Sequence, residues 1–301
     1  MPAPCVVAAQ ATDEVSLMNR FYATLVLALA LGLLVAGCGS SDDDSSAETS
    51  ATASCEPGEL ETVSNGMLTI ATDKPAYPPY FEDDDPTNGE GFESAVAYAI
   101  ADQLGYPAAK VKWTVEPFNS SYAPGPKKFD FDVNQISITP AREKAVDFSS
   151  PYYTANQAVV VLKDSDVAKA TDLEELQEAK LGVQIGTTSL EAAEDVIEPS
   201  SRPEVFNNST DVTTALKNGQ IDAIVVDLPT ALYLTAVEIP EATVAGQFSA
   251  PGGDQWGALL AKDSALTPCV SGAVEELESS GELEEITTKW MSTAAGAPVL
   301  E

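Results

Sequence analysis

Three segments of the chain carry polar groups that could bind a small charged molecule. The first is Ser137-Ile-Thr-Pro-Ala-Arg142, in which Thr139 is placed to cap a helix and Pro140 to begin it. Arg142 would then lie in the first turn, where a cation opposes the helix dipole. Bidentate binding of a carboxylate would explain an arginine at this position, and an exposed or structurally paired arginine is the alternative.

Two further segments could complete such a site. In Gly186-Thr-Thr188, Glu191 follows Thr188 by three residues, a capping-box pattern whose amides and hydroxyls could hold the same carboxylate. An apolar run ends in Asp227, an acid that could meet a cationic group or could cap the next helix. Ligands of open α/β sheets bind beyond the carboxyl ends of strands, so the three junctions are candidates for one ligand site.

The composition excludes several classes of function. The 301 residues contain no histidine, which rules out Ser-His-Asp and Cys-His nucleophiles and imidazole zinc sites. Lys and Arg number 15 against 47 Asp and Glu, and the formal net charge of −32 would repel a phosphate backbone. Such acidity either keeps a protein soluble in high salt or favours a cationic ligand, and composition does not separate the two.

The N-terminus has the features of an export signal. Phe21 to Ala36 form an apolar run of 16 residues, shorter than a membrane span. The run leads through Gly37 into Cys38, which resembles the bacterial lipobox, in which the cysteine is lipidated; an ordinary cleavage site is the alternative. The next residues are small or polar, as in a tether.

These features predict the boundaries of the exported protein. We expect a lipoprotein signal peptide over 1–37, lipidation at Cys38 and a flexible tether over 38–54. Asp13 and Glu14 are atypical of a signal peptide, so Met18 is the expected start. The exported region keeps two cysteines, Cys55 and Cys269, and we expect them to form a disulfide rather than two free buried thiols.

The rest of the chain predicts an α/β fold of two lobes, each with a mainly parallel sheet flanked by helices. We assign residues 55–157 and 250–293 to lobe 1 and 158–249 to lobe 2, joined by a hinge, with a C-terminal tail over 294–301. The expected strands are 67–72, 111–115, one through Ile136 and Ile138, 158–162, 181–185, one around Val205, 221–226 and 256–261. The expected helices are 92–104, one from Pro140, one through Leu190 and Ile197, one through Leu216, and two within 266–291 that break at Gly281.

From about Asn65 to Trp290 the chain resembles the family 3 extracellular solute-binding proteins, the amino-acid receptors of ABC importers. Seven ordered matches over this length carry the resemblance. They are Leu68 to Tyr80, Gly91-Phe92 with Ala101 to Gly105, Ser137 to Arg142, Val146 to Tyr152, Gly182 to Thr187, Asn218 to Ala223 with Asp227, and Lys289-Trp290. The resemblance implies a type II periplasmic-binding-protein-like fold with two lobes.

The resemblance also implies roles for individual residues. The residue that matches Arg142 holds the α-carboxylate of the ligand, with help from Ser137, Thr187 and Thr188, and the acid that matches Asp227 binds the α-ammonium. The aromatic residues that pack against the ligand match Tyr77, Tyr80 and Phe118. The residues that face its side chain match Asp73, Gln135 and Ile185. Simpler interpretations make Tyr80 and Phe118 core aromatics, Gln135 a strand residue that points away, and Asp73 a turn residue.

Three features fit known patterns less well. Many members of the family have an acid where this chain has Ala95, and the loop over 119–132 is unusually rich in Pro and Lys. The acidic run Glu82 to Asp85 lacks correctly spaced calcium ligands, so we expect a solvated turn there.

The implied function is that of a lipid-anchored receptor on the extracellular face of the bacterial cell membrane. It would capture an amino acid or a close relative, and a ligand that bridges Arg142 and Asp227 would stabilise the closed state. The closed form would dock on an ABC permease, and its ATPase subunits would supply the energy, because this sequence has no G-x-x-x-x-G-K-[ST] loop. We expect a monomer with no cofactor, no metal and no nucleic-acid partner.

Two other classes of function share parts of this pattern. The same fold occurs in periplasmic dehydratases of cyclohexadienyl acids, in which a cleft carboxylate is the general acid; here Asp73 or Asp227 would have to serve. Such an enzyme would turn over prephenate or arogenate, whereas we expect a receptor that releases its ligand unchanged. A sensory or cell-wall-acting module would carry a further domain, and we discount it because the chain ends soon after Trp290.

Overall fold

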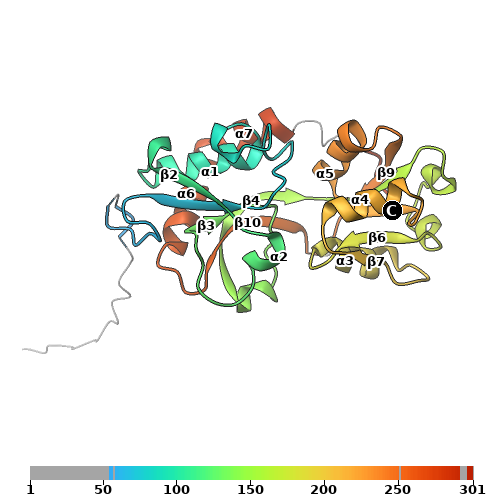
Figure 1. The fold of residues 1–301 in the computed structure, drawn as a ribbon, viewed down its shortest axis with the longest axis horizontal. Helices are drawn as coiled ribbons and strands as arrows, with labels where there is room; N and C mark the ends of the chain where they lie inside the picture. The colour runs from blue at the N-terminus through green and yellow to red at the C-terminus, as the bar shows by residue number, and fades with distance from the viewer. Residues whose placement is uncertain (1–53, 57, 251, 292–296, 301) are drawn as a thin grey trace, which may run out of the picture. The chain divides into compact units, whose positions relative to one another are not determined.

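A computed structural model describes residues 54–56, 58–250, 252–291 and 297–300 (Figure 1). The expected signal peptide, the lipidation site Cys38 and most of the expected tether lie outside the described residues. Part of the expected C-terminal tail does so as well. Among the helices of the described part, none is long and apolar enough to cross a membrane.

The first sheet has five strands in the order β2-β1-β3-β10-β4. β2 and β3 run parallel to β1, whereas β10 runs antiparallel to both β3 and β4. Every residue of β1 is buried, as expected for a strand covered on both faces. The strands are β1 (Leu68–Thr72), β2 (Val111–Val115), β3 (Phe131–Asp132), β4 (Val146–Ala155) and β10 (Asp254–Ala261).

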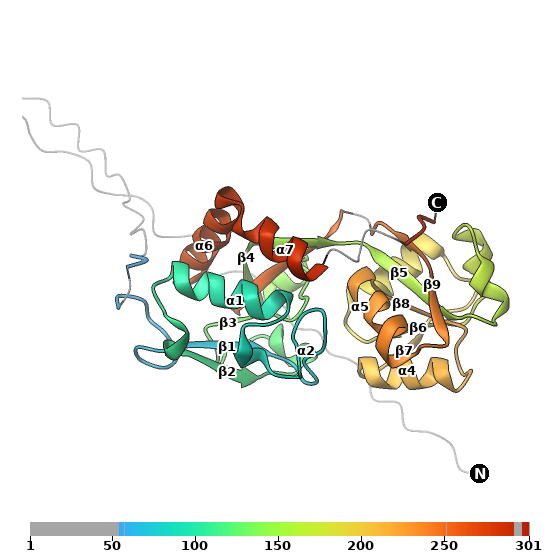
Figure 2. The ribbon, with the colours of Figure 1, turned by 90° about the horizontal axis from the view of Figure 1, so that it is seen from above.

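Three helices lie side by side on this sheet (Figure 2): α1 (Phe92–Gln103), α6 (Thr267–Ser280) and α7 (Glu282–Met291). Helix α1 buries an apolar stripe because Phe92, Val96 and Ile100 recur every four residues, and all three are fully buried. The break between α6 and α7 falls at Gly281, as predicted, where φ is 85°. A short helix, α2 (Phe118–Ser121), follows β2.

A disulfide joins Cys55 to Cys269, which confirms the predicted pair. It ties the segment before β1 to α6 across a sequence separation of 214 residues. In the chain-entropy account a loop of this length stabilises the folded state by about 5 kcal/mol.

The second sheet has five strands in the order β7-β6-β8-β5-β9. β6 pairs in parallel with β7 and β8, and β5 pairs antiparallel with β8 and β9. The strands are β5 (Gln157–Leu162), β6 (Leu181–Gln184), β7 (Glu204–Phe206), β8 (Ala223–Asp227) and β9 (Ala242–Phe248). The helices are α3 (Thr188–Ala192), α4 (Ser209–Lys217) and α5 (Leu228–Tyr233), and π-helical turns extend α3 and α5.

Both sheets are mixed, which corrects the expectation of mainly parallel sheets. The chain leaves the first sheet between Ala155 and Gln157 and returns to it between Phe248 and Asp254. The outgoing and returning strands are neighbours in each sheet, and they necessarily run in opposite directions: β4 pairs with β10, and β5 pairs with β9. The crossing of the chain between two lobes therefore accounts for the antiparallel pairs β4–β10 and β5–β9.

The segment before Arg142 also differs from the prediction. No strand runs through Ile136 and Ile138: β3 ends at Asp132, and the following residues make only an isolated bridge from Ser137 to Trp256. The expected helix from Pro140 is a 3-10 turn over Arg142–Lys144. Thr139 nevertheless caps this turn, because its Oγ1 accepts a hydrogen bond from the Arg142 amide at 3.2 Å.

Candidate ligand-binding site

A cleft of about 650 Å³ is lined by residues that follow strands of both sheets. This volume is in the range of small-molecule sites. Of the predicted site residues, the cleft brings together Arg142, Asp227, Ser137, Thr187, Thr188, Asp73, Tyr77, Phe118 and Gln135. Tyr80 and Ile185 are not among its lining residues.

Arg142 is 8% exposed and is held by backbone carbonyls of both lobes. Its Nη1 donates to the Ser137 carbonyl at 2.6 Å, and its Nη2 donates to the Gly186 carbonyl at 2.8 Å. The guanidinium carbon lies 5.5 Å from the Phe118 ring centre and 4.9 Å from that of Tyr122. Burial lowers the pKa of Arg142, but arginine stays charged in proteins. Two of its five N–H groups donate to these carbonyls, and the other three make no hydrogen bond to the part of the chain that the structure describes.

Thr188 is the first residue of α3, and Thr187 is the N-cap. The expected capping box is absent, since the N-cap side chain makes no cap hydrogen bond and the Thr187 hydroxyl donates instead to the Gln184 carbonyl at 2.9 Å. The Thr188 hydroxyl donates to Asp254 Oδ2 at 2.9 Å and is hydrogen-bonded to the Ser137 hydroxyl at 3.2 Å. Thr188 therefore connects the two lobes at the cleft.

Asp227 ends β8 and precedes α5, but its side chain makes no cap hydrogen bond to that helix. Its Oδ1 accepts a hydrogen bond from Gln157 Nε2 at 2.6 Å. Burial and the charge of Asp254 raise the pKa of Asp227 well above its usual value. A carboxyl group in this state favours a cationic partner, because a nearby positive charge would restore its ionised form.

The aromatic residues form a connected group on one side of the cleft. Tyr77 stacks on Tyr233 with ring centres 5.3 Å apart, and it meets Tyr80 edge-on at 5.7 Å. Tyr80 is fully buried against Trp256, and its hydroxyl is hydrogen-bonded to that of Thr230 at 2.8 Å. Tyr80 thus supports the cleft from behind and links the lobes. The sequence interpretation did not identify Thr230 and Tyr233.

Asp73 and Gln135 line the cleft, and other residues of the protein are hydrogen-bonded to most of their polar atoms. The Asp73 carboxylate accepts from the Lys74 amide at 2.7 Å and from the Phe118 amide at 3.0 Å. Gln135 has a φ of 50°, and its amide donates to Glu93 Oε1 at 2.6 Å. The Gln135 side-chain nitrogen donates to the other oxygen of Glu93. The amide oxygen of Gln135 is therefore the group left for a ligand.

Glu93 is a buried acid that the sequence interpretation missed. It is fully buried in α1, and Tyr152 donates a third hydrogen bond to it at 2.5 Å. Burial raises the pKa of Glu93 to about 7 despite these hydrogen bonds. Ile185, in contrast, is 44% exposed and lies outside the cleft lining, although Gln184 before it lines the cleft.

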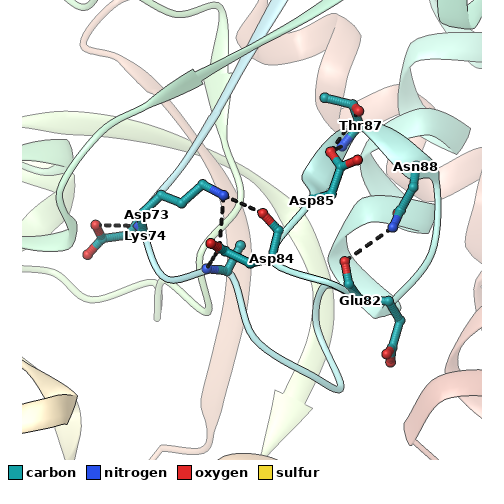
Figure 3. A network of polar contacts seen from close by, with 8 residues as sticks. Asp73, Lys74, Glu82, Asp84, Asp85, Thr87 and Asn88 are labelled. Atoms are coloured by element: carbon teal, nitrogen blue, oxygen red, sulfur yellow. Dashed lines mark hydrogen bonds and ion pairs between the residues drawn. The ribbon is translucent and has the colours of Figure 1, made fainter.

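The acidic run Glu82 to Asp85 packs back on the segment that carries Asp73 (Figure 3). Lys74 forms an ion pair with Asp84 at 2.9 Å, and the Ala76 amide donates to Asp84 Oδ1 at 2.7 Å. The described residues contain no group of three or more acidic or cysteine side chains arranged to hold a metal ion. These contacts position the segment between Asp73 and Tyr77 at the edge of the cleft.

Comparison with known proteins gives consistent matches over nearly the whole folded region. Residues 68–293 match the model of the bacterial extracellular solute-binding proteins, family 3. The arginine-binding extracellular protein ArtP of Bacillus subtilis is 30% identical over 273 residues, which cover 89% of this chain and 96% of ArtP.

Solved structures agree with the sequence matches. An ancestral arginine-binding protein bound to glutamine matches with a TM-score of 0.62 and 32% identity, over 75% of this chain and 98% of that protein. An ancestral amino-acid-binding protein described as a precursor of cyclohexadienyl dehydratase matches with a TM-score of 0.59 and 30% identity, over 75% and 95% of the two chains. These matches confirm the predicted type II fold with two lobes. The chain belongs to the bacterial extracellular solute-binding proteins of family 3.

Proposed function

We propose that this protein captures an amino acid between its two lobes and delivers it to the permease of an ABC importer. The observation that carries the proposal is the buried guanidinium of Arg142, which lines the cleft and keeps three N–H groups for an anion. Asp227 lines the same cleft from the other lobe. An α-amino acid carries the complementary pair of charges on adjacent groups.

The ligand acts as a bridge between the lobes in this proposal. Its carboxylate binds Arg142, with support from Ser137 and the Thr187–Thr188 turn, and its ammonium binds Asp227. Only the closed arrangement offers both charge-assisted contacts together, so binding shifts the population of lobe positions towards closure. The closed form is the one that docks on the permease.

Two hydrogen-bond acceptors in the cleft lining favour a ligand side chain that donates hydrogen bonds. Asp73 presents a carboxylate, and Gln135 presents its amide oxygen because Glu93 takes the nitrogen. These two acceptors offer no hydrogen bond to an acidic ligand side chain. Arginine, lysine, ornithine and glutamine carry suitable donors, and the relatives ArtP and the ancestral protein are named for arginine and glutamine.

Lipidation of Cys38 and residence on the extracellular face of the cell membrane are further parts of the proposal. The segment between Cys38 and Ser54 is composed of small and polar residues and would tether the folded region to the lipid. In this arrangement the receptor is a monomer that diffuses near its permease.

A ligand screen tests the proposal. Thermal shift and calorimetry on the purified protein would cover the twenty amino acids, ornithine, polyamines, prephenate and arogenate, with analysis for turnover of the last two. We expect an amino acid with a donor side chain to raise the Tm, and Arg142→Ala to abolish the shift. Arg202→Ala is the matched control, since Arg202 is an exposed arginine paired with Glu194. Conversion of arogenate or prephenate would instead identify a dehydratase.

A further inference from the structure

Gln157 joins two acids that belong to different sheets. Asp227 is the last residue of β8, and Asp254 is the first residue of β10. The side-chain nitrogen of Gln157 donates to Asp227 Oδ1 and to Asp254 Oδ2, each at 2.6 Å. One amide nitrogen bonds both groups, so the two carboxyl groups are neighbours beside the position proposed for the ligand's ammonium.

The surroundings do not balance two negative charges at this point. Asp254 is 2% exposed, and its Oδ1 has no hydrogen-bond partner among the described residues. Within the described ranges, the one further donor to the Asp254 side chain is the Thr188 hydroxyl, at 2.9 Å from Oδ2. Neutral amide and hydroxyl donors compensate a buried anion only in part, and adjacent carboxylates resist joint ionisation.

Charged groups on the neighbouring elements do not remove this conflict. Arg142 is a cation whose charge acts on both carboxyl groups, but it also makes its two bonds to backbone carbonyls. Glu191 of α3 adds a negative charge near Arg142. The charge of Asp254 raises the pKa of Asp227 beyond the effect of burial.

The remaining titratable groups that face the pair are phenols. Tyr77 and Tyr80 follow β1, and Tyr153 lies in β4; burial and the charge of Asp227 raise the pKa of each. These phenols are therefore neutral near pH 7, and they neither supply nor accept the charge that the pair lacks.

We propose that Asp227 and Asp254 share one proton while the cleft is empty, and that the ammonium of the ligand displaces this proton on binding. The inference rests on the proposed function, since it requires a ligand with an ammonium group. Asp254 does not line the cleft. It is a positioning residue that acts through its neighbours Asp227 and Thr188.

The exchange conserves charge at the site. The O–H bond of the shared carboxyl group breaks, and the proton passes to water and then to the buffer. The carboxylate oxygen that is freed accepts a hydrogen bond from the ammonium, which keeps all its protons. Because one positive charge replaces another, the binding constant becomes dependent on pH even though the ligand itself does not titrate in this range.

Calorimetry in buffers of different ionisation enthalpy tests the exchange on the full-length protein. The ligand is the amino acid found in the screen, other than histidine, because imidazole itself titrates near neutral pH. We expect release of about one proton per ligand at pH values below the raised pKa of Asp227, and less above it. The Kd should rise about tenfold for each unit by which the pH falls below the raised pKa of Asp227. An analogue with hydrogen in place of the ammonium should bind weakly and release no proton.

Two variants assign the proton to the pair. Asp254→Asn keeps the size of the side chain and an acceptor for Thr188, and it should reduce proton release, because burial alone then raises the pKa of Asp227. Asp263→Asn is the matched control, because Asp263 is exposed just beyond the other end of β10. It should leave affinity and proton release unchanged.

Each outcome of this experiment decides a specific point. Amino-acid binding to the native protein without proton release at any pH would overturn the inference and leave the proposed function intact. Unchanged proton release in Asp254→Asn would also overturn it. If no α-amino acid binds the native protein, the proposed function fails and the inference fails with it. Binding without proton release, and the absence of amino-acid binding, are both measured on the native protein, so neither result depends on the folding of a variant.

Discussion

Glu93 binds both the backbone amide and the side-chain amide of Gln135, and so fixes a residue with a left-handed backbone at the edge of the cleft. A φ of 50° is uncommon for a residue with a side chain, and it needs support from its surroundings. The same contact occupies the side-chain nitrogen of Gln135, a residue that lines the cleft. A buried acid of α1 thus determines a chemical group that the cleft presents.

Glu93 should make the stability of the ligand-free protein depend on pH. Its pKa is about 7 in the folded state and near 4.5 when unfolded, so the folded state binds more protons between these values. The contribution of Glu93 to the free energy of unfolding is therefore fully present below about pH 4.5. It falls by about 3 kcal/mol as the pH rises to about 7. Urea unfolding across this range should show a shallower fall with pH in Glu93→Gln. Glu90→Gln, at an exposed position, should keep the native slope.

Gly186 should tolerate no side chain, because the segment of lobe 1 that contains Asn119 and Tyr122 packs against it. A Cβ at Gly186 would overlap the Tyr122 hydroxyl and the Asn119 side chain, and its φ is 74°. Gly186→Ala should weaken ligand binding at least tenfold by separating Gly186 from Arg142. Gly219→Ala provides the control, since φ there is 66° with nothing within 4 Å of the added carbon. It should cost about 1 kcal/mol of stability and leave the Kd unchanged. If Gly186→Ala and Gly219→Ala changed the Kd equally, the contact between Gly186 and Arg142 would not contribute to ligand binding.

Much of the site could be predicted because its residues follow strands directly in the sequence. Thr188 and Asp227 stand at such junctions, whereas Arg142 was assigned to the end of a strand that the structure lacks and lies instead in a 3-10 turn; the cleft contains all three. Gln135 was assigned to the cleft for a different reason, its match to a family position, and its backbone prevents the strand that was expected around it.

Other residues left no local signal in the sequence. Gln157 and Asp254 are 97 residues apart, and they meet only because the chain crosses between the lobes twice. Glu93 lies in an amphipathic helix, where an acid is normally expected on the solvent side. The strands β4 and β9 were missed because their burial does not alternate regularly, and β4 includes Pro151.

The hydrogen bond between Tyr80 and Thr230 should stabilise the closed arrangement, because the two residues belong to different lobes. Tyr80→Phe and Thr230→Val should each weaken ligand binding about fivefold, corresponding to about 1 kcal/mol. The double variant should lose little more than either single one, since both remove the same contact. Calorimetric Kd values for the four proteins measure this coupling. Additive losses would show that the two hydroxyls act independently.

The disulfide should matter for stability and not for ligand affinity. Cys55 and Cys269 connect the start of the folded region to α6, and neither residue lines the cleft. Replacing both by serine should lower the free energy of unfolding by about 3 to 5 kcal/mol. The Kd should stay within twofold at a temperature where the variant is folded. A large loss of ligand affinity would contradict this prediction and show that the disulfide is needed for closure of the lobes.

A crystal structure with the bound amino acid tests the central claim most directly. We expect both carboxylate oxygens of the ligand within about 3 Å of the Arg142 guanidinium, and its ammonium at the same distance from Asp227. A ligand whose carboxylate lies away from Arg142, or whose ammonium contacts no oxygen of Asp227, would contradict the account.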